Sequence, residues 1–339
     1  MRKFTIFILF LLFAGFIFPE KIVPFPDLAI PQEIIIDQNQ IFITEFPQVY
    51  IYSLNDFKLI TKFGRAGEGP QEFFQFVRVR INPDSPEYIL VGSQMRMSFF
   101  TREGKFFKEI RLEVNTRGRR IFEPLGKRYA MYGSYEENKI MYRTVDLYDE
   151  TLNNKIKQVT MWKLILQQTR PINFTDRDLQ GGEFTTYDKK IFVLLREKGD
   201  VDVFDDDGKK LFSINYDYER VPVTKEDEME IRNFFQKTPG RRQFYESVKQ
   251  QLFFPTYFPV ARQLTIADNK IYVLTNKKEK GKSEFVIFDI KGKFLKKIMV
   301  PFKNMDPHES YPFTIFDGKI FQFMENEKTE KWELQINEI

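Results

Sequence analysis

The stretch Val77–Ile110 reads VRVRINPDSPEYILVGSQMRMSFFTREGKFFKEI, and it decides the fold. Four short runs in it are apolar or alternate between apolar and polar residues: Val77–Ile81, Tyr88–Val91, Met97–Phe100 and Phe106–Ile110. Turn residues separate the runs, including Asn-Pro-Asp at 82–84 and Glu-Gly-Lys at 103–105. Runs of this length bounded by turn residues are typical of β-strands. The stretch therefore predicts an antiparallel meander of four strands.

The same order of strands and turns recurs along the chain. Aromatic residues mark equivalent positions at Tyr52, Phe100, Tyr148, Phe204 and Phe288. The first two intervals are 48 residues, close to the length of a propeller blade, whereas the later intervals of 56 and 84 residues require insertions. The pattern predicts an all-β protein, a six-bladed β-propeller of four-stranded antiparallel blades. The predicted blades span residues 34–63, 74–112, 120–162, 183–216, 261–301 and 311–338.

The last predicted blade has only three strands of its own. The segment Ile22–Ile30 precedes the first blade and has no partner there. We expect it to supply the missing outer strand and to close the ring, because closure protects the sheet edges that would otherwise promote aggregation.

The segment Val221–Pro259 interrupts the β pattern between blades four and five. Thr224 and Asp227 have the spacing of a helix capping box, and an apolar set follows them. A second helix is predicted from Arg241 to about Leu252. The insertion at about 221–259 is thus expected to be a helical hairpin, either packed on the ring or acting as a lid or a partner-docking element.

Residues 1–20 have the form of an export signal. Arg2 and Lys3 precede an uncharged run of 15 residues, Phe4–Phe18, which is shorter than the roughly 20 residues of a membrane span. We expect a signal peptide or, if it is retained, an N-terminal membrane anchor. Residues 21–339 would then form the propeller domain in the periplasm or outside the cell.

The charge and cysteine content of the chain limit the classes of ligand and site that it can have. The 52 basic and 48 acidic residues are scattered and give a net charge of +4, so nothing indicates nucleic-acid binding. The chain has no cysteine, which excludes disulfides, thiolate zinc sites and a cysteine nucleophile. We expect a monomer without a cofactor.

The links between strands in a four-stranded blade alternate between the two faces of the ring. The links between blades and those from second to third strands therefore share one face, the long-loop face. The opposite face, the plain face, carries the glycine turns. The long segments all fall in the first set: residues 64–73, 163–182, 196–200, 221–259, 276–282 and 303–310. Binding residues are common on loops held by a rigid scaffold, so we predict the binding site on the long-loop face.

The link Phe63–Phe73 reads FGRAGEGPQEF, and the next blade contains QMRMSFF followed by a Gly-Lys-Phe turn. This combination resembles the NHL-like and TolB-like six-bladed propellers that bacteria export. The resemblance covers most of the chain from about residue 30, although only the link is specific, and many such proteins carry a lipidated cysteine that this chain lacks. The glycines do not indicate a phosphate site, because Pro70 and a strand follow them instead of a helix.

The candidate ligand-binding residues are Arg65, Glu68, Arg78, Arg80, Arg120 and Arg262. Arg78 and Arg80 alternate with apolar residues on the predicted innermost strand of blade two, and two others immediately precede the innermost strands of blades three and five. Together the arginines would ring the channel mouth and attract an anionic ligand or an acidic peptide. The alternative is that they pair with carboxylates such as Glu68 and Glu72, or are solvated.

No catalytic set of residues is evident. His308 is the only histidine, and Pro307 beside it indicates a surface turn. A calcium site would need oxygen ligands, but Asp205–Asp207 followed by Gly208 fits a hairpin turn better. Asn173 begins a glycosylation sequon, which would matter only in a eukaryotic secretory context.

The pattern favours an exported, non-enzymatic scaffold that binds a protein, peptide or glycan. The alternative is a calcium-dependent lactonase, esterase or lyase on a similar propeller, which fold alone cannot support. A third hypothesis is a subunit of an envelope complex.

Overall fold

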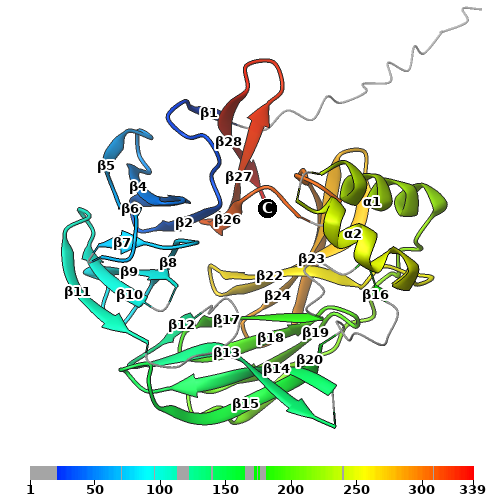
Figure 1. Ribbon diagram of the computed structural model, residues 1–339, viewed down its shortest axis with the longest axis horizontal. Coiled ribbons are helices and arrows are strands. Elements are labelled where there is room, and N and C mark those ends of the chain that lie inside the picture. Colours follow the sequence, from blue (N-terminus) through cyan, green and yellow to red (C-terminus); the bar gives the residue numbers. More distant parts are fainter. Residues whose placement is uncertain are drawn as a thin grey trace, which may run out of the picture.

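The computed structural model describes residues 21–69, 71–94, 96–112, 122–138, 140–164, 172–173, 175, 181–238, 240–307 and 309–339. Six four-stranded antiparallel sheets surround one axis, as Figure 1 shows. The predicted six-bladed propeller is confirmed. The export signal predicted at residues 1–20 lies outside the described residues, as do Arg120 and His308.

Each blade runs from an innermost to an outermost strand. Blade one contains β2 (Glu33–Asp37), β3 (Gln40–Glu45), β4 (Gln48–Ser53) and β5 (Leu59–Phe63). Blade two contains β8 (Arg78–Ile81), β9 (Tyr88–Ser93), β10 (Arg96–Thr101) and β11 (Phe106–Arg111). Blade three contains β12 (Phe122–Leu125), β13 (Arg128–Glu137), β14 (Ile140–Tyr148) and β15 (Lys155–Lys163). Blade four contains β17 (Gly182–Tyr187), β18 (Lys190–Leu195), β19 (Asp200–Phe204) and β20 (Lys210–Ile214). Blade five contains β22 (Ala261–Ala267), β23 (Lys270–Glu279), β24 (Lys282–Asp289) and β25 (Phe294–Pro301). Blade six contains β26 (Phe313–Phe316), β27 (Lys319–Asn326), β28 (Lys331–Glu338) and β1 (Lys21–Phe25).

The middle strands of the blades are the most buried. Strands such as β3, β4, β10 and β18 have four consecutive buried residues, because each blade packs between two neighbours and so buries both of its faces. The apolar clusters accordingly join adjacent blades. Phe42 of blade one, for example, packs in one cluster with Ile89 and Phe100 of blade two.

The ring closes where the predicted extra strand pairs with the end of the chain. β1 pairs antiparallel with β28, and Lys21 lies opposite Ile336. Phe25 at the end of β1 is buried, and its ring lies edge-on to those of Tyr52 (4.9 Å) and Phe323 (5.2 Å). One side chain thus joins blade six to blade one.

The link between blades one and two is held by its own side chains. Its two short strands, β6 (Arg65–Ala66) and β7 (Glu72–Phe73), pair in parallel. Phe73 is fully buried in the cluster between the two blades. Gly64 has a φ of +102°, and a Cβ there would lie 2.6 Å from the Phe73 ring, so this position needs glycine. The interpretation of the link as a structural element is consistent with this packing.

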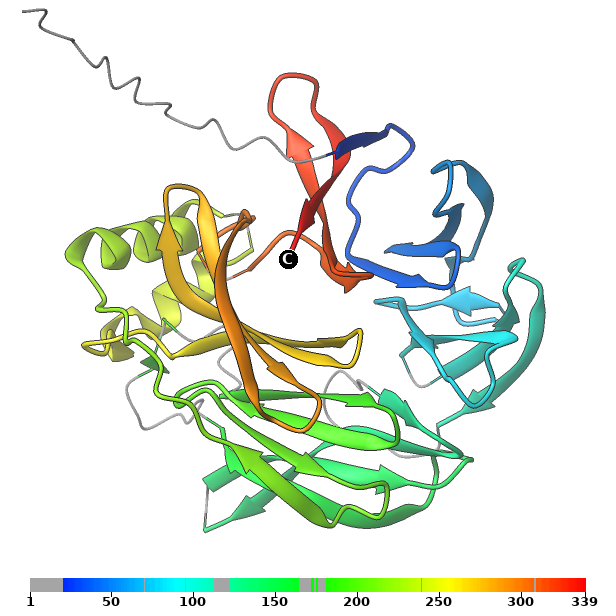
Figure 2. The same ribbon diagram turned by 180° about the vertical axis from the view of Figure 1, so that it is seen from behind.

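The insertion forms a separate layer on a two-stranded stem. Val223 N–H donates to the Thr256 carbonyl (3.0 Å), and Phe258 N–H donates to that of Val221 (2.9 Å). Beyond the stem lie α1 (Lys225–Lys237), α2 (Arg242–Val248), a 3-10 turn (Lys249–Gln251) and β21 (Leu252–Phe253). β21 pairs in parallel with β16 (Ile172–Asn173) from the link between blades three and four. Both Figure 1 and Figure 2 place the helices beside blade five.

The predicted capping box of α1 is present. The Thr224 hydroxyl accepts from Asp227 N–H (3.1 Å), and the Asp227 carboxylate accepts from Thr224 N–H (2.9 Å). The second helix ends four residues earlier than predicted, because the chain tightens into the 3-10 turn before β21. The helices share a small core of Ile231, Phe235 and Tyr245.

The outer strands carry a charge pattern that suits exposed edges. The six outermost strands contain ten basic residues and a single acidic one, Glu109. Lysine on an unpaired edge opposes pairing with another chain, because a second strand would have to bury its charge. The ring therefore has protected edges at its circumference as well as at its closure.

The role of Phe25 in closing the ring predicts that truncating its side chain strongly lowers the free energy of unfolding. We expect Phe25→Ala to lower the free energy of unfolding by about 3–5 kcal/mol, since the change leaves a cavity between blades six and one. Urea denaturation followed by tryptophan fluorescence measures this. Ile22→Ala in the same strand is the control, because Ile22 is 48% exposed and its truncation should cost less than about 0.5 kcal/mol. Equal penalties would contradict the role given to Phe25.

Candidate functional site

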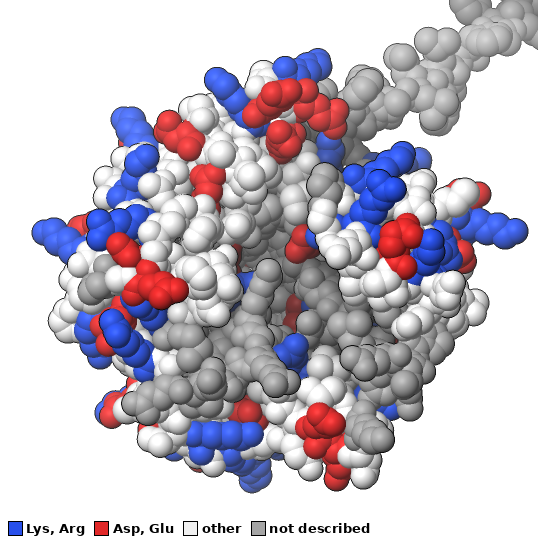
Figure 3. All heavy atoms as spheres, in the orientation of Figure 1, with Lys and Arg blue, Asp and Glu red and all other residues white. Residues whose placement is uncertain are grey.

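A cavity of about 1150 Å³ occupies the axis of the ring. All six innermost strands contribute to its walls, and Figure 3 shows the face hollowed at its centre. Neighbouring innermost strands contact one another in the order β2, β8, β12, β17, β22 and β26 around the ring. Side chains alternate along each strand, so one set packs between blades and the other faces the cavity.

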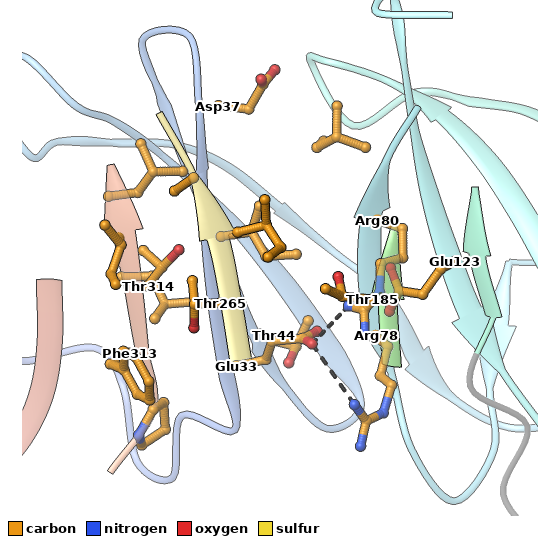
Figure 4. A pocket seen from close by; sticks show the side chains of 18 of the residues that line it. Glu33, Asp37, Thr44, Arg78, Arg80, Glu123, Thr185, Thr265, Phe313 and Thr314 are labelled. Atoms are coloured by element: carbon orange, nitrogen blue, oxygen red, sulfur yellow. Dashed lines mark hydrogen bonds and ion pairs between the residues drawn. The ribbon is translucent and has the colours of Figure 1, made fainter. Parts of the chain in front are cut away.

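Strand register identifies six equivalent positions, one per blade. Each lies opposite a residue of the second strand in the same blade, and that residue is the second of the consecutive buried residues in its strand. In blade order these positions, here called the middle ring, are Ile35, Arg80, Glu123, Thr185, Thr265 and Thr314. Blades two and three therefore supply charge, whereas blades four to six supply hydroxyls. Figure 4 shows Arg80 and Glu123 to the right of the cavity and Thr265 and Thr314 to the left.

The charged half is a chain of ion pairs. Arg80 Nη1 lies 2.7 Å from Glu33 Oε1, and Arg80 Nε lies 2.7 Å from Glu123 Oε1. Arg78 Nη1 approaches the same Glu33 oxygen at 3.8 Å, as the dashed lines in Figure 4 mark. The side chains of Arg80 and Glu123 are only 13% and 11% exposed. Charges this deep are tolerated when they are paired and hydrogen-bonded.

Burial and pairing act in opposite directions on these groups. Burial raises the pKa of Glu123 above its ordinary value, although the neighbouring Arg80 charge acts to lower it. Burial alone would lower the pKa of Arg80, but the carboxylates of Glu123 and Glu33 outweigh it and raise that pKa. Arg80 therefore stays charged, and its charge holds the two carboxylates in place.

Two glutamates at the long-loop end of innermost strands link adjacent blades. Glu33 of blade one accepts from Val79 N–H of blade two (3.2 Å). Glu183 of blade four makes the equivalent bond to Leu264 N–H of blade five and also accepts from Arg196 Nη2 (2.9 Å). Glu33 thus both holds the ring together and faces the cavity.

The hydroxyl half has hydrogen-bonding capacity to spare. Thr185, Thr265 and Thr314 line the cavity and are partly exposed. Within the described part of the chain, the hydrogen bonds include none from these three hydroxyls. The neighbouring Thr186 differs, because its hydroxyl donates to the Pro124 carbonyl (2.7 Å). Each free hydroxyl offers one donor and two acceptor sites.

The described rim on the long-loop face includes large apolar side chains among polar ones. Ile30, between blades six and one, is 67% exposed, and Met305, between blades five and six, is 48% exposed. Both residues line the cavity, together with Phe76 and Tyr311. Large exposed apolar side chains at a cavity mouth are a common feature of binding sites.

The predicted site residues separate into two groups. Arg78 and Arg80 lie on the innermost strand as predicted and line the cavity. Arg65 is 76% exposed and pairs with Glu72 (2.9 Å), while the main-chain carbonyl of Glu68 accepts from Arg96. Arg262 lies within β22 instead of before it, is buried, and donates to Asn304 Oδ1 (2.7 Å). Arg120 lies outside the described residues.

The described lining of the cavity is net acidic, although two arginines belong to it. Among the described lining residues, three are basic and seven acidic, a formal net charge of −4. The lining therefore does not favour an anion, because Arg78 and Arg80 face carboxylates. A role for these two arginines in ligand binding stays a prediction.

Sequence reasoning missed Glu33, Glu123 and the three threonines. The signal was present, since aligning the six innermost strands by their hairpin turns places all but Glu33 at one position. Glu33 lies two residues nearer the long-loop face, at the level of Arg78. The contacts of these two carboxylates with Arg80 depend on the packing of adjacent blades, so the sequence alone did not reveal them.

Other candidates belong to turns. Asp205 accepts from Lys209 N–H (2.8 Å), as expected of a hairpin turn, and Asp207 pairs with Arg128 of blade three (2.7 Å). The described residues contain no group of three or more His, Asp or Glu placed to hold a metal ion. No helix in the described ranges is long and apolar enough to span a membrane.

Comparisons with known proteins bear on the fold. No family model matches the sequence. No curated protein has a sequence significantly similar to that of this chain. A crystal structure from Bacteroides fragilis, of a protein provisionally described as exported, has a TM-score of 0.54 and 11% identity over 94% of this chain and 95% of that one. A DUF4221 family member from Bacteroides vulgatus has a TM-score of 0.53 and 11% identity over 95% and 98%.

At this identity the likeness concerns the fold alone. Export is stated of the first of these two proteins, and export of this chain stays a prediction. The resemblance to NHL-like and TolB-like families stays a prediction.

The chain of ion pairs predicts that substituting Arg80 lowers the free energy of unfolding more than substituting the exposed Arg65. We expect Arg80→Met to lower the free energy of unfolding by about 3–5 kcal/mol, because the buried Glu123 and the partly buried Glu33 lose their counter-charge. The control is Arg65→Ala, which removes an exposed pair and should cost about 0–1 kcal/mol. Urea titration at pH 7.5 measures both, and similar values for the two would refute the role assigned to Arg80.

The penalty of Arg80→Met should also depend on pH. Without Arg80, burial raises the pKa of Glu123 further, so the native state binds this proton more tightly than the unfolded state does. Stability of the variant then falls as pH rises through and above the ordinary glutamate range. We expect a smaller deficit relative to the parent at pH 5 than at pH 8, again by urea titration. A deficit independent of pH would argue against the burial of the Glu123 carboxylate.

Proposed function

We propose that this chain is an exported, non-enzymatic scaffold that binds a protein, peptide or glycan at the cavity mouth on the long-loop face. It acts in the periplasm or outside the cell. One observation carries this function: a cavity of about 1150 Å³ lies on the ring axis beneath a rim with exposed apolar side chains, Ile30 and Met305 among them. Rigid walls, an apolar rim and a few convergent polar groups are the usual properties of a binding pocket.

The architecture supports this choice of face. The insertion and the long links between blades rise from the long-loop face, while short turns such as Asp317–Gly318 form the plain face. Loops can change without disturbing the blades that hold them, so recognition usually resides there. The edges of the ring are less suited to binding another strand, because lysines occupy them.

Site-specific photocrosslinking in the producing cells tests the face that binds. A benzophenone amino acid replaces Ile30 or Met305 at the rim, and Leu59 or Leu211 on outer strands as matched exposed apolar controls. Benzophenone inserts into C–H bonds, so it captures proteins and glycans alike. We expect adducts from the two rim positions and few from the controls, read by mass spectrometry. Adducts mainly from positions 59 and 211 would overturn the assignment.

A further inference from the structure

The middle ring points to a ligand class, and this inference rests on the proposed binding at the cavity. We propose that the cavity binds a neutral oligosaccharide, with the hydroxyls of Thr185, Thr265 and Thr314 as hydrogen-bonding partners. The three residues come from consecutive blades and occupy the same register. They therefore present three hydroxyls at one level of the cavity wall.

Hydroxyls suit a hydroxylated ligand. A threonine hydroxyl donates one hydrogen bond and accepts two, and a sugar hydroxyl does the same, so each contact can form in either direction. These hydroxyls make no hydrogen bond to the described residues and need not break one to bind a ligand. Hydroxyls wet by solvent exchange such partners at little cost.

The charged half favours a neutral ligand. Glu33 and Glu123 are engaged by Arg80, and Glu33 also has Arg78 nearby. An anion would meet a lining of net charge −4. A cation that paired with Glu33 or Glu123 would have to separate these ion pairs and leave Arg80 without its partner. Beside one another, a carboxylate and a guanidinium offer an acceptor and a donor, the combination that two neighbouring sugar hydroxyls require.

Apolar walls complete the environment. Ile35 occupies the blade-one position of the middle ring, and Phe76, Tyr311 and Phe313 line the cavity nearer the long-loop face. The C–H faces of a sugar ring can pack against such side chains while its hydroxyls reach the threonines. The volume of about 1150 Å³ lies just above the usual range of about 300–1000 Å³ for small-ligand pockets, which favours several linked sugar units over one.

Calorimetric titration of the purified protein tests the ligand class. The probes are neutral hexasaccharides of α-1,4-glucose, β-1,4-glucose, β-1,4-xylose, β-1,4-mannose and N-acetylglucosamine. Comparison probes are a hexagalacturonate, which is anionic, and one acidic and one basic hexapeptide. We expect at least one neutral hexasaccharide to bind, and to bind more tightly than any comparison probe.

Removing the hydroxyls tests the residues. Valine has nearly the shape of threonine without the hydroxyl, so Thr185→Val, Thr265→Val and Thr314→Val together should raise the Kd for that sugar about tenfold or more. Thr265→Val alone should raise it about threefold, which guards against a folding defect in the triple variant. The matched control is Thr160→Val on outer strand β15, which should leave the Kd unchanged. Thermal melting checks that all variants fold.

The outcomes separate this inference from the function on which it rests. Failure of every neutral sugar to bind at millimolar concentration would overturn it, as would sugar binding that the triple variant leaves intact. Binding of a peptide or hexagalacturonate alone would also overturn it. If rim crosslinks at Ile30 and Met305 persist in that case, binding at the long-loop face stands and only the ligand class is wrong.

Discussion

Pairing of β1 with β28 is the interaction on which the rest of the structure depends. It completes the sixth blade and places Phe25 between the first blade and the last. A blade buries both of its faces only when it has a neighbour on each side, so an open ring would leave two apolar faces in water. Closure also brings all six innermost strands around one axis, which creates the cavity.

A closed ring turns sequence differences between blades into an asymmetric site. The six positions of the middle ring are equivalent in the backbone, yet they carry an apolar residue, an ion pair and three hydroxyls. The ring tolerates Arg80 because carboxylates from blades one and three meet it at 2.7 Å. Each of these charges comes from a different blade, so the fold is needed before any of them is compensated.

The insertion shows how the ring accommodates added structure. Its helices have a core of their own around Ile231 and Phe235, on a stem of paired backbone. Blade four and blade five keep their strand order on either side of it. A segment with a separate core and a narrow attachment can be gained without repacking the blades, which is consistent with long segments collecting on one face.

The sequence by itself determined the blade count, the closing strand, the capped helix and the face that carries the long links. These features follow from local rules, because turns, strand periodicity and helix caps depend on residues that are close together in the sequence. It also placed Arg78 and Arg80 on an innermost strand. Only the tertiary structure decided that Arg80 is neutralised, that Arg65 and Arg262 lie away from the cavity, and that three threonines share one level. The physical reason is that partners such as Glu33 and Glu123 lie more than forty residues from Arg80, and only ring geometry sets their distances.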